Sequence, residues 1–139
     1  MNLIEQIKKD AIIESYPLGT TLRKLHLLAL QLGDESTVIW VEKELEGYDQ
    51  HESLPNYRIV EAELQGFYLR SRFDRPRWQW LSNRVPAERE EDLLRHRFFE
   101  GIPAIDEDLR SLGSKKPLKV PVPPSEVEEL RGKLNLFLR

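Results

Sequence analysis

The hydrophobic pattern of the chain changes its period after Gly47. Before Gly47, apolar residues recur every three to four positions, whereas between residues 60 and 65 apolar and polar residues alternate. The first period places apolar side chains on one face of a helix, and the second places them on one face of a strand. The sequence therefore predicts an α+β fold that is predominantly helical, with a helical part at residues 1–47 and a strand-rich part at residues 54–99.

Three helices are predicted before Gly47. The first carries an apolar stripe and ends before Pro17, with Leu3, Ile4, Ile7 and Ala11 in the stripe. Thr20 or Thr21 is expected to cap the second helix, which is apolar nearly all round and should therefore be the most buried helix. Gly33 ends it, and Asp34 caps a third helix whose inner positions are Val38, Val41 and Leu45, with Trp40 alongside.

A small antiparallel sheet is predicted to follow. Its first strand runs through residues 60–65, and a β-bulge at Gly66 would explain why the apolar parity then shifts to Phe67 and Leu69. Trp78, Trp80 and Val85 indicate a second strand. Residues 93–99 fit either a strand or a helix, and a third strand is favoured.

Two further helices are predicted after the sheet. The first covers residues 102–112, with Pro103 in its first turn, and a proline-rich connector follows at residues 113–124. Ser125 and Glu128 form a capping box for the last helix, residues 125–139, which has no stop signal and is expected to continue into a longer protein. Its apolar face predicts a homodimer, with contacts at Val127, Leu130, Leu134 and Phe137.

Composition narrows the class of protein. A chain of 139 residues suits one domain, and the absence of cysteine fits a reducing cytoplasm. No signal peptide and no apolar run of membrane-spanning length is present, so we expect no membrane partner. The formal net charge of -3 argues against a dedicated nucleic-acid binder.

The histidines supply one candidate catalytic pair. Arg89 and His96 fit the Arg-x(4–6)-His pattern of HEPN-type ribonucleases, in which the arginine holds phosphate charge and the histidine moves protons. HEPN domains are all-helical, which disagrees with the predicted strands. His26 is interpreted as a helix-flank residue and His51 as a loop residue, so no metal site is expected.

Other catalytic signatures are absent from the sequence. None of the lysines has an acid two residues before it, which excludes the Asp/Glu-x-Lys nuclease signature. There is no G-x-G-x-x-G, Walker or G-x-S-x-G motif, so no cofactor is expected and an enzyme is not favoured.

One segment, residues 67–84, is locally basic and aromatic. Five arginines and one aspartate give it a charge of +5 - 1 = +4. Arginines and aromatic rings could hold phosphates and stack bases, and the candidates are Arg70, Arg72, Arg75, Arg77, Trp78 and Trp80. The favoured interpretation is that the arginines pack on aromatic rings and pair with Glu42, Glu46, Glu61 and Glu63.

The stretch from Trp40 to Arg58 is interpreted as a structural pin that joins helices to sheet. Gly47 is expected to end the third helix in the left-handed conformation, and Tyr48 to fold back on that helix. Trp40 is expected to fill the space between helix and sheet. Glu44 could pair with Arg58 across the turn. The pin comprises Trp40, Glu44, Leu45, Gly47, Tyr48, Pro55, Tyr57 and Arg58.

Five sequence stretches resemble the AbiTii domain of bacterial abortive-infection proteins. They are "LRKLHLLALQLG", "WVEKELEGY", "LPNYR", "EGIPAIDEDLRSL" and "LKVPVPPSEVEEL", and the similarity covers about residues 2–135. The resemblance implies a role in phage defence, often as the N-terminal module of a larger protein, and it carries no catalytic residues over. We therefore expect a non-catalytic interaction module that engages a protein partner or a fused effector domain.

Overall fold

The computed structural model describes residues 1–67, 78–113 and 116–133 of the chain, which divides into two compact units. Unit 1 consists of Met1–Leu54 and Phe99–Leu118, and unit 2 of Pro55–Phe98 and Lys119–Arg139. The fold is α+β and predominantly helical, as predicted. The prediction that the two units form one domain stays a prediction.

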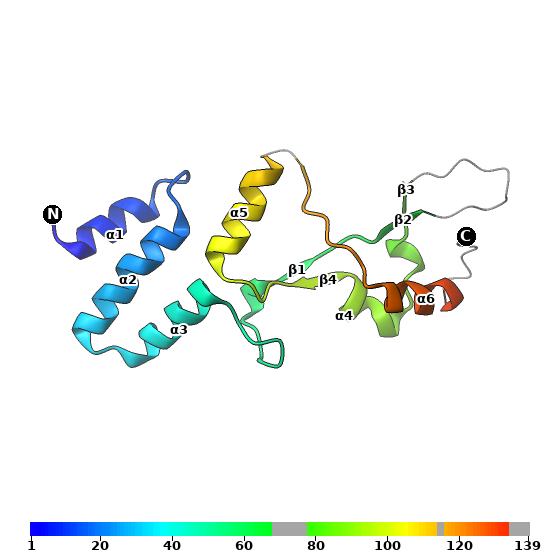
Figure 1. Ribbon diagram of the computed structural model, residues 1–139, viewed down its shortest axis with the longest axis horizontal. Coiled ribbons are helices and arrows are strands. Elements are labelled where there is room, and N and C mark those ends of the chain that lie inside the picture. The colour runs from blue at the N-terminus through cyan, green and yellow to red at the C-terminus, as the bar shows by residue number, and fades with distance from the viewer. Residues whose placement is uncertain (68–77, 114–115, 134–139) are drawn as a thin grey trace. The chain divides into compact units, whose positions relative to one another are not determined.

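Unit 1 is built from four helices among its described residues (Figure 1), namely α1 (Leu3–Ala11), α2 (Leu18–Leu32), α3 (Glu35–Glu46) and α5 (Ile102–Leu112). Helix α2 packs against α1 and α3, and α5 packs against α2 and α3. The predicted bounds of α5 are confirmed, with Pro103 in its first turn.

A half-buried ion pair joins α1 to α2. Asp10 is buried, and Lys24 donates to its Oδ2 at 2.6 Å and to the Tyr16 hydroxyl at 3.3 Å. The hydrogen bond to Asp10, and then that to Tyr16, raises the pKa of Lys24. Because α1 turns this polar side toward α2, Ile4 and Ala11 of the predicted apolar stripe are exposed.

Helix α2 differs from the prediction in its start and its burial. It begins at Leu18, because the Pro17 carbonyl accepts bonds from the amides of residues 20 and 21, so neither threonine is the cap. Its neighbours cover only part of its circumference. Three leucines are consequently more than half exposed, at 55% for Leu27, 54% for Leu30 and 72% for Leu32. Helix α2 still holds more buried residues than the other helices of unit 1, as predicted, but it is not covered all round.

The predicted caps at both ends of the turn between α2 and α3 are confirmed, and Val41 is buried as predicted. Trp40 does not fill the core. Gly33 ends α2 at φ 68°, and the Asp34 carboxylate accepts from the Thr37 amide at 3.2 Å. Val41 is fully buried at 0%, whereas Trp40 is 41% exposed. Since neighbouring helical positions differ by about 100° in direction, Val41 occupies the inward side and Trp40 cannot share it.

The end of α3 and the start of α5 meet at two glycines. Gly47 has φ 105° and ψ 171°, and it forms a β-bridge with Glu100, while the Tyr48 amide donates to the Phe99 carbonyl at 2.7 Å. A Cβ on Gly101 would lie 2.1 Å from the Leu45 carbonyl oxygen. The predicted positive φ of Gly47 is confirmed, but its ψ is extended instead of helical.

Unit 2 contains short strands that pair in two antiparallel sheets among its described residues. β1 pairs with β4 and β2 with β3, the strands being β1 (Ile59–Glu61), β2 (Gln65–Phe67), β3 (Trp78–Trp80) and β4 (Arg95–Arg97). Gly66 sits in regular register opposite Gln79, so the predicted bulge is wrong. Residues 62–64 separate β1 from β2, and the Leu64 amide donates to the Ser82 hydroxyl there at 2.9 Å.

The remaining segments of unit 2 are short helices and α6. They are η1 (Asn56–Arg58), η2 (Ser82–Arg84), η3 (Ala87–Arg89), α4 (Glu90–Leu93) and α6 (Pro124–Lys133). Strand β4 occupies only the middle of the stretch 93–99 where a strand was favoured. Leu93, at the start of that stretch, belongs to α4. Val85 lies outside β3 yet belongs to the core of unit 2, which comprises Leu64, Leu81, Val85 and Leu93, with Leu94 and Val122 packed against it.

Helix α6 begins one residue before the predicted start. The Pro123 carbonyl accepts from the amides of Glu126 and Val127, so Pro124 occupies the first turn. The side chain of Leu130, and residues Leu134 and Phe137, lie outside the described part of the chain.

We expect Gly47→Ala to destabilise the protein more than Gly113→Ala. Both glycines have positive φ with extended ψ, a region that costs other residues on the order of 1–3 kcal/mol. A Cβ on Gly47 would also lie 2.7 Å from the Phe99 carbonyl oxygen, whereas one on Gly113 meets nothing within 4 Å. In urea denaturation, the free energy of unfolding of Gly47→Ala should be lower than that of Gly113→Ala by roughly 1 kcal/mol or more. Equal losses would contradict the close contact.

We expect the Asp34 cap to make stability depend on pH. Hydrogen bonds from Thr37, and then Ser36, lower the pKa of Asp34 below its usual value. Its contribution is therefore present above the unfolded pKa of about 3.9 and is lost as the pH falls through the lower folded value. Urea midpoints should show Asp34→Ala less stable than wild type at about pH 7, with the gap closing toward about pH 2.

The substitution Asp34→Asn serves as the control for this experiment, because asparagine also caps helices but does not titrate. This variant should keep most of the stability at neutral pH. A gap between wild type and Asp34→Ala that stays constant with pH would contradict a charged cap.

Candidate functional site

The predicted pin stays a prediction, but one of its contacts lies around Tyr48 in unit 1. The Tyr48 hydroxyl donates to Glu44 Oε1 at 2.6 Å, so the tyrosine folds back on α3 as predicted. Glu44 is only 3% exposed. A buried carboxylate is stable only when hydrogen-bonded or paired, and Tyr48 supplies one such bond. The contact holds the chain close to the helix it has just left.

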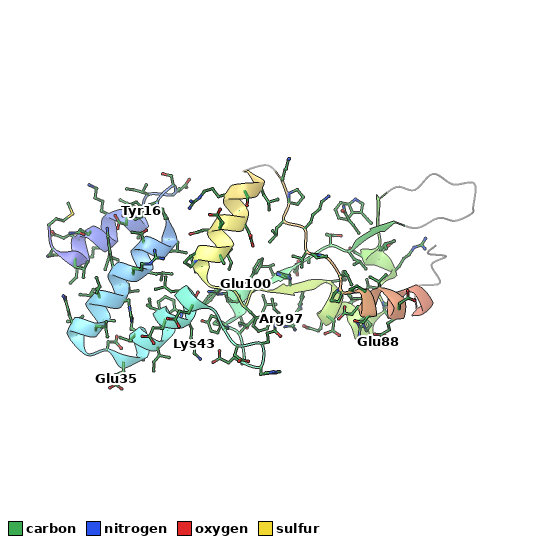
Figure 2. All side chains as sticks on the ribbon, in the orientation of Figure 1. Tyr16, Glu35, Lys43, Glu88, Arg97 and Glu100 are labelled. Carbon is green, nitrogen blue, oxygen red and sulfur yellow. The ribbon has the colours of Figure 1, made fainter. Side chains whose placement is uncertain are left out.

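The loop after Tyr48 is held by its own polar groups. Lys43, which is labelled in Figure 2, forms an ion pair with Glu52, and Glu52 also accepts from the Asp49 amide at 2.9 Å. The bond from Lys43, and then that from Asp49, lowers the pKa of Glu52. Asp49 in turn accepts from the His51 amide at 2.8 Å. Both carboxylates therefore order the loop.

In unit 2, Arg58 anchors the chain that leads into β1. Arg58 is 3% exposed, its guanidinium donates to the Phe98 carbonyl at 3.4 Å, and its own carbonyl accepts from the Phe98 amide at 2.9 Å. Pro55 precedes η1, and Tyr57 is exposed. The predicted pair of Glu44 with Arg58 joins residues of different units and stays a prediction.

Arg89 lies in an acidic environment. Its guanidinium is 3.5 Å from Asp92, 3.9 Å from Glu126 and 3.7 Å from Glu129, and its buried Nε has no hydrogen-bond partner among the described residues. Two of these acids come from α6, so the arginine connects α6 to the start of α4. The three carboxylates more than balance its single positive charge.

His96 lies in the middle of β4 instead of on a helix. It pairs with Val60 of β1, and its ring meets the Phe98 ring edge-on at a centroid distance of 4.4 Å. Within the part of the chain that the structure describes, no hydrogen bond, ion pair or ring contact joins His96 to Arg89. The pair fits the sequence pattern of HEPN ribonucleases but has a different structural setting.

Most of the basic and aromatic segment lies outside the described residues. Arg70, Arg72, Arg75 and Arg77 fall there, as does the side chain of Trp78, whereas Trp80 is exposed. Of the acids expected to pair with these arginines, Glu42 is 3.2 Å from His26 Nε2 and Glu63 accepts from the Ser82 hydroxyl at 2.7 Å. The predicted pairing stays a prediction.

Sequence reasoning missed two contributors to these sites. Gly101 was not identified, although its position directly before Ile102 and Pro103 marks a helix start where a close approach is possible. Ser82 was also missed, and a serine just after a strand that ends in tryptophan gives no signal of a bond to a residue 18 positions earlier.

No described helix has both the length and the apolar character needed to cross a membrane. Within the same residues, no three histidine or acidic side chains gather as ligands for a metal ion.

Comparison with known proteins identifies a family. The chain matches no curated protein and no solved structure. A family model named AbiTii matches residues 2–137, which is nearly the whole chain. The chain belongs to the AbiTii family.

Proposed function

We propose that the chain is a non-catalytic interaction and assembly module of a bacterial abortive-infection system. The AbiTii family suggests an abortive-infection, phage-defence protein. In this proposal the module acts in the cytoplasm, self-associates as a dimer, and engages a protein partner or a fused effector domain.

The observation that carries this proposal is the surroundings of Arg89. A ribonuclease of the HEPN type needs its arginine to hold phosphate charge in the transition state. Here Asp92, Glu126 and Glu129 surround the guanidinium, so an approaching phosphate would meet a net negative charge. The arginine is better suited to holding α6 than to binding RNA.

His96 supports the same conclusion. A histidine that acts as general acid or base must reach the reacting atom of the substrate. His96 sits within a paired strand and packs on Phe98, which is a common structural role for an aromatic ring in a sheet. The ribonuclease that uses Arg89 and His96 is therefore the alternative, not the leading proposal.

We expect the protein to show no ribonuclease activity. A labelled single-stranded RNA should stay intact with and without Mg²⁺, in the presence of wild type, His96→Ala or the control His51→Ala. General acid or base catalysis contributes on the order of 10²–10⁴ in rate. Cleavage by wild type that falls about 100-fold in His96→Ala but not in His51→Ala would establish the alternative.

The second alternative, a nucleic-acid or anion-binding module, is favoured by one observation. Trp80 presents an exposed ring within the basic segment, where it could stack on a base. Titrating the same RNA tests this, because binding through phosphates weakens steeply with salt. Tight, salt-sensitive binding that is lost when Arg70, Arg72, Arg75 and Arg77 are replaced by glutamine would favour this alternative over ours.

A further inference from the structure

The last described segment of unit 2 is attached through few contacts. We call residues 119–133 the α6 strap, in which α6 follows an irregular stretch up to Pro123 (Figure 1). Val122 packs against the apolar core of unit 2, whereas Pro121 and Pro123 have no amide hydrogen to donate. From Val120 to Pro123, no backbone hydrogen bond reaches the described residues outside the strap. The stretch before α6 is therefore held mainly by one apolar side chain.

Helix α6 buries little of its own surface. The structure describes its side chains at residues 124–129, and none of these is buried. Glu126 and Val127 are half-buried, and the other four are exposed. Because most of the stability of a helix in a protein comes from packing an apolar face, this part of α6 gains little from packing.

The contact between α6 and Arg89 is electrostatic. The Arg89 guanidinium lies 3.9 Å from Glu126 and 3.7 Å from Glu129. Both distances exceed the roughly 2.7–2.9 Å of a charge-assisted hydrogen bond. The side chains of these two acids are 39% and 44% exposed, so water and salt reach the ion pairs. Ion pairs of this kind contribute little to stability, and salt weakens them further.

Opening this contact does not leave Arg89 without a partner. Removing one member of a buried ion pair is costly when it leaves an uncompensated charge. Asp92 lies 3.5 Å from the same guanidinium and is not part of the strap, so it still pairs with Arg89 when α6 leaves. The buried Nε of Arg89 has no hydrogen-bond partner among the described residues, so the closed contact already lacks one bond. The free energy needed to open the strap is therefore small.

We propose that the α6 strap is a releasable element, which switches unit 2 between a closed and an open state. Opening withdraws Val122 from the apolar core and removes Glu126 and Glu129 from Arg89. The local charge of Arg89 and its acids then changes from +1 - 3 = -2 to +1 - 1 = 0, so the surface no longer repels an acidic group. This switch goes beyond the proposed function, since it is independent of whether the module assembles or cleaves RNA.

Amide hydrogen exchange of the full chain tests the switch, because a closed segment exchanges through local opening. Raising NaCl from about 0.1 M to about 1 M shortens the Debye length from about 10 Å to about 3 Å. The amides of α6 should then exchange at least about fivefold faster, because salt screens the ion pairs that hold the helix. The amides of the paired strands β1 and β4 should keep their exchange rates and serve as the internal reference.

Two variants remove the contact from opposite sides. Glu126→Gln with Glu129→Gln changes α6, and Arg89→Gln changes the residue that α6 contacts. Each should speed α6 exchange at about 0.1 M NaCl by at least about fivefold and abolish most of its salt dependence. Combining them should add little, because both remove the same contact. The matched control is Glu88→Gln, at the exposed acid before Arg89 that Figure 2 labels, and it should exchange like wild type.

Three results would overturn the proposal. Exchange of α6 as slow as that of β1 and β4 at both salt concentrations would show that α6 is a fixed part of unit 2. Effects of Arg89→Gln and of the α6 double variant that add up would show that they act on separate contacts. Equal acceleration in Glu88→Gln would assign the effect to net charge. Circular dichroism checks that each variant folds, and the α6 double variant tests the switch on its own where Arg89→Gln does not fold.

Discussion

The arrangement of unit 1 depends on a contact between two backbones. The Leu45 carbonyl, in the last turn of α3, lies so close to Gly101 that a Cβ there would sit 2.1 Å away. The bridge between Gly47 and Glu100 and the bond from Tyr48 to Phe99 hold the same two segments together. Two segments more than 50 residues apart in sequence therefore meet with no side chain between them.

The position of α5 follows from this contact. The helix starts directly after Gly101, which places Pro103 near Gly19 of α2, 3.5 Å from the position of a Cβ there. Small residues at both places let the helices approach closely. Helix α5 therefore lies against the first part of α2, whereas Leu27 and Leu30 further along the helix remain exposed.

Charged groups that could serve chemistry have structural partners in both units. Asp10 bonds to Lys24, Glu44 to Tyr48 and Glu52 to Lys43, and Arg89 lies among three acids. A buried or half-buried charge needs such compensation to be stable. The same partners reduce the capacity of these groups to bind a substrate, which is why we place function at a surface between proteins.

The sequence predicted features that depend on near neighbours. Gly33, the Asp34 cap, the positive φ of Gly47 and the full extent of α5 each follow from a few adjacent residues, and each is confirmed. Features that depend on distant segments could not be predicted in this way. The break that the Ser82 hydroxyl stabilises beside Leu64 looked like a bulge, and which of Trp40 and Val41 points inward depends on how α3 packs.

Replacing Gly101 by alanine tests the backbone contact most directly. Gly101 has φ -65° and ψ 153°, which any residue adopts, so the backbone itself does not oppose the change. At such a position, Gly→Ala alone stabilises by about 0.4–1 kcal/mol through the unfolded chain. The contact with Leu45 predicts the opposite effect for Gly101→Ala, because the end of α3 and the start of α5 must move apart to admit the Cβ. Urea denaturation should show a free energy of unfolding lower than that of wild type by an amount on the order of 1–3 kcal/mol. A Gly101→Ala variant as stable as wild type, or more stable, would contradict the account.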